Sequence, residues 1–287
     1  MSNSLKPRIL SIIAESPARL STPRLASILA PEGITRRAVR DAVAELVAEN
    51  RLTYTSHFGG SYLEVSFSRS VKVGARVILA PPRVSMPLCG DEVGVRIAPG
   101  AAFGTGAHPT TRLALAGLEW AVAAADGAVA HWRALDIGTG SGVLALAAVR
   151  LGAAAAVGID LDPCARAEAL ENVRENGLEG RVAIEDRDLG DLDGPFELIL
   201  ANLRTPTLAR LGPEIVRLIA PDGRVVLTGA RPDEMADLLA GYAGVGLTDR
   251  WRETDGGWAG AVVSPGKSSA LEPIGAGPAG KTPEGGT

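Results

Sequence analysis

The first 70 residues carry hydrophobic positions at the spacing of three short helices. Apolar residues three or four apart predict a helix over residues 5–13, and Pro17 ends it. Ser21 and Thr22 can cap a second helix with Pro23 at its first position, and Thr35 is expected to cap a third. The region therefore begins with three helices before any strand.

Two strand-like runs follow the third helix, LTYTS at 52–56 and SYLEVSF at 61–67. They are joined across Gly59 and Gly60, which predicts a hairpin. Three helices and a hairpin resemble a winged helix, so we expect a small winged-helix-like domain over residues 1–70.

Beyond residue 130 the pattern changes to apolar strands that alternate with helices. The run ALDI enters the glycine loop 138–142, a helix follows over 143–152, and the run AAVGID ends in Asp160. A further apolar run, ELILA, ends just before Asn202. Strand, loop, helix and strand form a βαβ unit, which predicts an α/β fold with a parallel sheet.

The glycine loop has the chemistry of a ligand site. Its glycines, at 138, 140 and 142, let the backbone turn sharply and let a ligand approach closely. The helix after the loop offers unpaired amide groups, and Asp160 can accept hydrogen bonds from both hydroxyls of a ribose. Asp136 lies two residues before Gly138, which gives D-x-G-x-G-x-G, whereas a dinucleotide site uses G-x-G-x-x-G. The pattern resembles the first motif of class I S-adenosyl-L-methionine-dependent methyltransferases, whose cofactor has a zwitterionic methionine end instead of a pyrophosphate.

Two further motifs flank this loop. AAFGTGAHPTTRLAL, at 101–115, contains a glycine-rich segment with Phe103 and a helix that begins at His108. Thr110 and Thr111 lie in the first turn of that helix, where hydroxyls can face a carboxylate. In FELILANLRTP, Asn202 stands at the carboxyl end of a buried strand, where parallel sheets bind ligands.

Together the three motifs resemble the bacterial lysine methyltransferases of large-subunit ribosomal protein L-eleven. The resemblance covers about residues 90–264, and FGTG-x-HPTT is its most specific part. It implies a Rossmann-like class I methyltransferase sheet with helices on both faces. It further implies that S-adenosyl-L-methionine is bound by Phe103, Thr111, Asp136, Gly138, Gly140, Gly142, Asp160 and Asn202. Asn202 would also act in catalysis, beside the amine of a protein substrate.

The N-terminal region departs from this family, which normally has a small α/β domain that recruits the substrate. We expect four parts in this chain: the winged-helix-like domain 1–70, a β-rich connection 71–100, the methyltransferase domain 101–264 and a disordered Gly/Pro-rich tail 265–287.

Charge leaves the role of the N-terminal region open. Residues 1–70 carry nine Lys/Arg and six Asp/Glu, whereas the whole chain has a net charge of −4. The third helix begins with the basic cluster Arg36, Arg37 and Arg40. These side chains and the hairpin could contact nucleic acid through residues 35–67, dock a protein, or simply be solvated.

Composition removes several classes of protein. The N-terminus lacks the pattern of a signal peptide, and no apolar run is long enough to cross a membrane. Cys89 and Cys164 are isolated, and the three histidines are scattered, so neither a disulfide framework nor a metal site is expected. We therefore expect a cytoplasmic protein without a metal, whose oligomeric state the sequence leaves undetermined.

Two other functions compete with protein methylation. One is a nucleic-acid methyltransferase guided by the winged helix, although the sequence after Asn202 lacks the prolines and the aromatic residue of an NPPY-like motif. The other is a DNA-binding regulator that only senses S-adenosyl-L-methionine. Turnover with a nitrogen acceptor distinguishes an enzyme from a sensor, and salt-dependent binding to duplex DNA favours a regulator.

Overall fold

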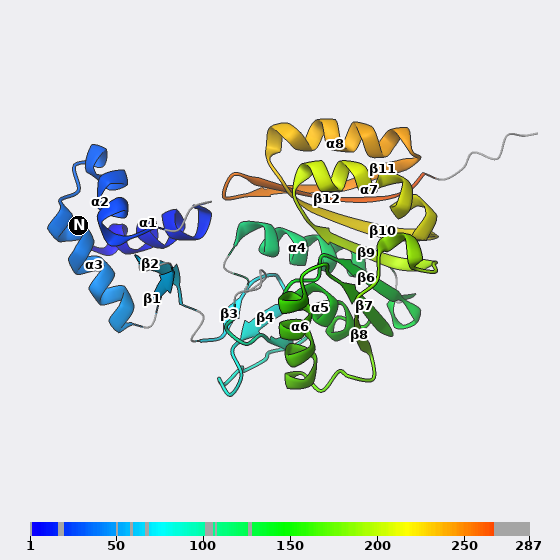
Figure 1. The fold of residues 1–287 in the computed structure, drawn as a ribbon, viewed down its shortest axis with the longest axis horizontal. Helices are drawn as coiled ribbons and strands as arrows, with labels where there is room; N and C mark the ends of the chain where they lie inside the picture. Colours follow the sequence, from blue (N-terminus) through cyan, green and yellow to red (C-terminus); the bar gives the residue numbers. More distant parts are fainter. Residues whose placement is uncertain are drawn as a thin grey trace, which may run out of the picture.

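The computed structural model places three helices and a hairpin at the N-terminus, as the hydrophobic pattern predicts (Figure 1). It describes the chain in these ranges: 2–16, 20–49, 51–57, 60–66, 69–100, 106, 108–125 and 128–266. The N-terminal elements are α1 (Ser2–Glu15), α2 (Thr22–Leu29), the short η1 (Ala30–Glu32), α3 (Arg36–Ala48), β1 (Leu52–His57) and β2 (Gly60–Val65).

Of the two candidate caps of α2, the structure uses Ser21, and the predicted cap of α3 at Thr35 is confirmed. The Ser21 hydroxyl accepts from the Arg24 amide at 3.4 Å, and the Thr35 hydroxyl accepts from the Ala38 amide at 3.2 Å. Leu20 bridges to Leu63 on β2, and the buried side chains of these elements form a separate hydrophobic core. The order of elements is as expected, and the winged-helix assignment itself stays a prediction.

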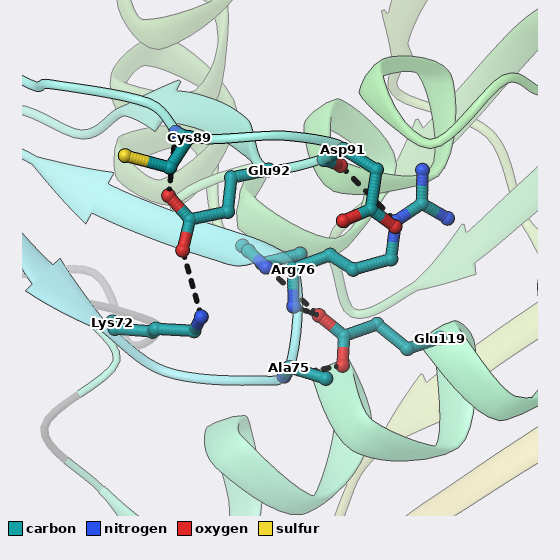
Figure 2. A network of polar contacts seen from close by, with 8 residues as sticks. Lys72, Ala75, Arg76, Cys89, Asp91, Glu92 and Glu119 are labelled. Atoms are coloured by element: carbon teal, nitrogen blue, oxygen red, sulfur yellow. Dashed lines mark hydrogen bonds and ion pairs between the residues drawn. The ribbon is translucent and has the colours of Figure 1, made fainter.

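A three-stranded sheet follows, made of β3 (Val71–Lys72), β4 (Val77–Ala80) and β5 (Val93–Arg96) in that order. A single carboxylate joins it to α4 (Pro109–Ala123), as Figure 2 shows. Glu119 on α4 is 8% exposed and accepts from the backbone amides of Ala75, Arg76 and Val77 at 2.7–2.8 Å. The turn before β4 is therefore held against α4 by three charge-assisted hydrogen bonds.

The largest sheet has seven strands in the order β11-β12-β10-β9-β6-β7-β8. Its strands are β6 (Arg133–Ile137), β7 (Ala155–Ile159), β8 (Val182–Glu185), β9 (Phe196–Asn202), β10 (Ile219–Ala230), β11 (Leu247–Asp255) and β12 (Trp258–Pro265). The pairs from β8 to β10 are parallel, and β12 is antiparallel to β10 and β11.

Helices cover both faces of this sheet, as expected for a Rossmann-like fold (Figure 1). The remaining helices are η2 (Ala128–His131), α5 (Val143–Arg150), α6 (Pro163–Glu175), η3 (Leu189–Asp191), α7 (Thr205–Leu218) and α8 (Pro232–Gly244). On β9, Leu198 and Leu200 pack on the side of α4 and α5, whereas Ile199 and Ala201 pack on the side of α7 and α8. Both faces of the central strand are therefore buried, which explains its continuous apolar run.

Asp222 and Gly223 lie inside β10, where the register with β9 shifts between Ile219 and Arg224. Five residues of β10 advance along two residues of β9, so the extra residues form a bulge within one strand.

Candidate active site

The glycine loop connects β6 to α5 in a conformation that requires glycine. Gly138, Gly140 and Gly142 have φ angles of 71°, 54° and 80°, which L-residues with a side chain rarely adopt. A Cβ at Gly138 would come within 2.6 Å of Leu203, and one at Gly142 within 3.3 Å of Ala169 on α6. The loop is thus packed between the segment after β9 and α6.

Asp136 organises the loop from beneath. Its Oδ2 accepts from the Thr139 hydroxyl at 2.8 Å and from the Ala145 amide at 3.1 Å. The residue is 1% exposed, its Oδ1 has no hydrogen-bond partner within the described ranges, and burial raises its pKa to about 6. Asp136 therefore ties β6, the loop and the start of α5 together at an electrostatic cost.

Asp160 follows β7 and contacts the same loop. One carboxylate oxygen accepts from the Gly140 amide at 2.9 Å, and the other accepts from the Asp162 amide at 3.0 Å. The side chain is thereby fixed, and each oxygen retains capacity for a second donor. Such a carboxylate at the end of a strand is preorganised for a pair of hydroxyl groups.

A cavity of about 390 Å³ lies at the carboxyl ends of β6, β7, β8 and β9. Its lining combines isoleucine and leucine side chains with two acids, an arginine, a threonine and a glycine: Ile137, Gly138, Ile159, Asp160, Leu161, Arg187, Asp188, Leu189, Leu203, Thr207 and Leu211. A mostly apolar pocket with a few polar groups suits a nucleoside, whose base is flat and whose sugar is polar.

The first turn of α4 presents a buried hydroxyl without a partner. Thr111 is fully buried, and its Oγ1 has no hydrogen-bond partner among the described residues. A Cβ built at Gly260 would contact both Leu113 on α4 and Thr228 on β10, so this turn lies over the carboxyl end of β10. An unsatisfied hydroxyl at the positive end of a helix is suited to a carboxylate.

His108 caps α4 and is held in place. Its Nδ1 accepts from the Thr110 amide at 3.2 Å, and its ring lies edge-on to Trp258 at 5.3 Å. Burial lowers the pKa of His108, and the charges of Arg112 and Arg231 lower it further. This position agrees with a role in shaping the start of the helix.

Asn202 is the last residue of β9 and is half-buried. It pairs in register with Thr228 of β10, which places it at the same sheet edge as the first turn of α4. Its side chain has no hydrogen bond to another residue in the described part of the chain. The Leu203 amide, one residue on, donates to the Thr228 carbonyl at 3.0 Å and directs the chain across β10.

The structure thus brings the predicted residues to one edge of the sheet, except Phe103, which lies outside the described residues. Sequence reasoning missed the cavity residues after β8, Arg187 and Asp188. The rule that identified Asp160 and Asn202 could have found Asp188, because it also follows a parallel strand.

The sheet, the helices on both faces and the glycine loop define a Rossmann-like fold of the class I methyltransferase type. Residues 67–264 match the model of the family described as Ribosomal protein L11 methyltransferase (PrmA), and the chain belongs to that family. The match begins at residue 67, so the comparison with the family says nothing about the helices before it.

Individual relatives agree with this membership. The chain is 38% identical to the ribosomal protein L11 methyltransferase of Myxococcus xanthus over 226 residues, which cover 78% of this chain and 76% of the relative. It is 38% identical to that of Pelobacter propionicus over 196 residues, 68% of this chain and 62% of the relative. The chain therefore spans less than two thirds of the length of the latter.

A solved structure is similar as well. The crystal structure of the ribosomal protein L11 methylase from Lactobacillus delbrueckii subsp. bulgaricus has a TM-score of 0.61 and 29% sequence identity. The similarity covers 69% of this chain and 98% of that chain.

The described residues contain neither a candidate metal site nor a candidate membrane-spanning helix. Within them, His, Cys, Asp and Glu side chains form no group of three or more that could hold a metal ion. In the same ranges, every helix is too short or too polar to cross a membrane.

Proposed function

We propose that this chain is an S-adenosyl-L-methionine-dependent protein N-methyltransferase that acts on lysine or N-terminal amines of ribosomal protein L11. The observation that carries the proposal is the unpartnered Thr111 hydroxyl at the sheet edge that also holds Asp160 and Asn202. The relatives are named ribosomal protein L11 methyltransferases, which supports the substrate.

The site fits the cofactor group by group. Asp160 receives the ribose hydroxyls, and the apolar cavity receives the base beside Asp188. Gly138 and Gly140 have no Cβ, so the backbone of the loop can approach the ligand closely. Thr111 donates its hydroxyl hydrogen to the methionine carboxylate, which gives a partner to a buried atom that otherwise has none.

When bound, the cofactor supplies a methyl group on a sulfonium, which is already activated for transfer. The protein has to place the acceptor amine in line with that methyl group and keep water away. The amide oxygen of Asn202 accepts a hydrogen bond from the amine and so fixes its orientation. An ordinary lysine is charged at neutral pH, so the amine has to lose a proton before it attacks.

We assign recruitment of the substrate to the N-terminal region. Residues 1–70 form the winged-helix-like domain, 71–100 the connection, 101–264 the methyltransferase domain and 265–287 the tail. Arg37 and Arg40 are 85% and 72% exposed in their side chains, although both lie near Asp41. The N-terminal region has its own hydrophobic core, and its exposed basic side chains can dock an acidic region of a partner.

The proposal is tested by incubating the purified chain with labelled S-adenosyl-L-methionine and ribosomal protein L11. Label in L11, and its loss with Asn202→Ala, is expected. Ribosomal RNA and duplex DNA serve as competing acceptors in parallel reactions. Label in nucleic acid alone would establish the nucleic-acid methyltransferase, whereas cofactor binding without transfer to any acceptor would favour a sensor.

A further inference from the structure

Three polar side chains lie four residues apart along α6 and its C-terminal cap: Glu168, Asn172 and Asn176. Four residues of helix rise about 6 Å, and two residues of an extended strand advance about 6.6 Å. Such a line of side chains can therefore contact alternate residues of a neighbouring extended chain.

The stretch that follows β5 is that extended chain. Asn176 accepts from the Arg96 amide at 2.9 Å and donates to the Arg96 carbonyl at 2.7 Å. Asn172 Oδ1 accepts from the Ala98 amide at 2.8 Å. A Cβ at Gly100 would come within 2.1 Å of the Glu168 carboxylate, so the two residues are in direct contact.

The other edge of this stretch is paired with backbone. The Ile97 amide donates at 2.9 Å to the carbonyl of Ala80, the last residue of β4. The backbone amides of Arg96 and Ala98 point toward α6, and the amide of Ile97 between them points toward β4. The asparagine amides thus take the place of a further strand, and they hold residues 96–98 from the side that would otherwise be an open edge.

Asn172 alone of the two asparagines also contacts the glycine loop. Its Nδ2 donates to the Ser141 carbonyl at 2.8 Å, and the residue is 1% exposed. Ala169, one turn earlier on α6, lies against Gly142. One buried amide therefore bridges the loop to Ala98, whereas the side chain of Asn176 bonds to the backbone of Arg96 and to the Asn172 carbonyl, away from the loop.

We propose that Asn172 is a positioning residue that couples the 96–98 stretch to the glycine loop and so holds the loop in its ligand-binding conformation. A buried amide with both ends bonded fixes two backbone segments relative to each other. The consequence for S-adenosyl-L-methionine affinity rests on the proposed function. The coupling itself does not.

Three variants separate coupling from simple stabilisation. Asn172→Ala removes both contacts. Asn172→Asp, studied at pH 8 where the new carboxylate is ionised, keeps the acceptor for Ala98 and loses the donor to Ser141. Asn176→Ala is the matched control, because it removes a buried asparagine from the same line without touching the loop.

Amide hydrogen exchange, followed residue by residue by NMR, tests the coupling in the full-length protein without ligand. In Asn172→Ala, faster exchange is expected at Ala98 and at the loop amides 138–140. In Asn172→Asp only the loop amides should exchange faster, and in Asn176→Ala only Arg96. Loop exchange unchanged in both Asn172 variants, or equally increased in Asn176→Ala, would overturn the proposal.

Calorimetric titration with S-adenosyl-L-methionine, at a temperature where all variants are folded, supplies the functional readout. Both Asn172 variants are expected to bind about tenfold more weakly, and Asn176→Ala within about twofold of wild type. If the two Asn172 variants and Asn176→Ala bind S-adenosyl-L-methionine with the same affinity, Asn172 stabilises the fold without positioning the loop for the ligand. Should the wild-type protein bind no S-adenosyl-L-methionine, the proposed function fails, and the exchange pattern alone decides the coupling.

Discussion

Among the residues of the site, Thr111 has the environment that points most directly to a bound ligand. It is fully buried and has no hydrogen-bond partner in the part of the chain that the structure describes, and burying it without one costs stability. A bound carboxylate would supply that partner. The hydroxyl therefore favours ligand binding but lowers the stability of the protein without ligand.

Thr111→Val tests this conflict, because valine has nearly the same shape and lacks the hydroxyl. The variant should be as stable as wild type or more stable, and should bind S-adenosyl-L-methionine about five- to tenfold more weakly. Denaturant unfolding and calorimetry measure the two effects. A loss of stability with unchanged affinity would mean that the hydroxyl serves the fold instead.

Asp136 gives a pH dependence at the same scale. Burial raises its pKa from 3.8 to about 6, so the folded state binds the proton more tightly than the unfolded state. Its contribution to stability is therefore complete below about pH 4 and is lost as the pH rises through 6. The difference corresponds to about 3 kcal/mol.

Asp136→Asn should remove this pH dependence, because an asparagine amide does not titrate. The unfolding free energy of the variant, relative to wild type, should be higher at pH 7 than at pH 4. Urea denaturation of both proteins at the two pH values measures this change. A difference between variant and wild type that stays constant with pH would show that Asp136 does not titrate in this range.

At the scale of elements, α4 is fixed at both ends. Its first turn lies at the site, and Glu119 binds the turn before β4 with three backbone amides (Figure 2). Glu119→Gln keeps one acceptor oxygen but places an amide donor opposite backbone donors. The variant should lose about 1–3 kcal/mol of unfolding free energy.

Asp91→Asn is a suitable control for that measurement. Asp91 belongs to the same network, through Arg76, but its side chain is 75% exposed. Exposed ion pairs contribute little, so thermal unfolding should change much less than in Glu119→Gln. If the two substitutions destabilise the protein equally, the hydrogen bonds of Glu119 do not contribute specially to stability.

How far the sequence predicts these elements depends on whether the signal is local. The caps at Ser21 and Thr35, the glycine loop and the strand that ends in Asn202 follow from neighbouring residues, and the structure confirms them. The bulge in β10 and the Asn172 bridge depend on partners far along the chain. Spacing alone therefore does not reveal them.

At the scale of the whole molecule, the cores divide the chain. The N-terminal core contains only residues up to Leu63, and both cores around the large sheet begin after Val71. Residues 71–287 alone should therefore keep wild-type affinity for S-adenosyl-L-methionine and lose most activity on the native protein substrate. Calorimetry and methyl transfer measure the two properties, and full activity of the truncated chain would exclude recruitment by residues 1–70.

The central claim is that the carboxyl edge of the large sheet binds S-adenosyl-L-methionine. Calorimetric titration of the wild-type protein and of Asp160→Ala tests it most directly, with Asp160→Asn as a control that keeps one acceptor. We expect wild type to bind S-adenosyl-L-methionine and not NAD, and Asp160→Ala to bind more weakly by about 1.5–3 kcal/mol. Binding of NAD by the wild-type protein, or unchanged affinity for S-adenosyl-L-methionine in Asp160→Ala, would contradict the account.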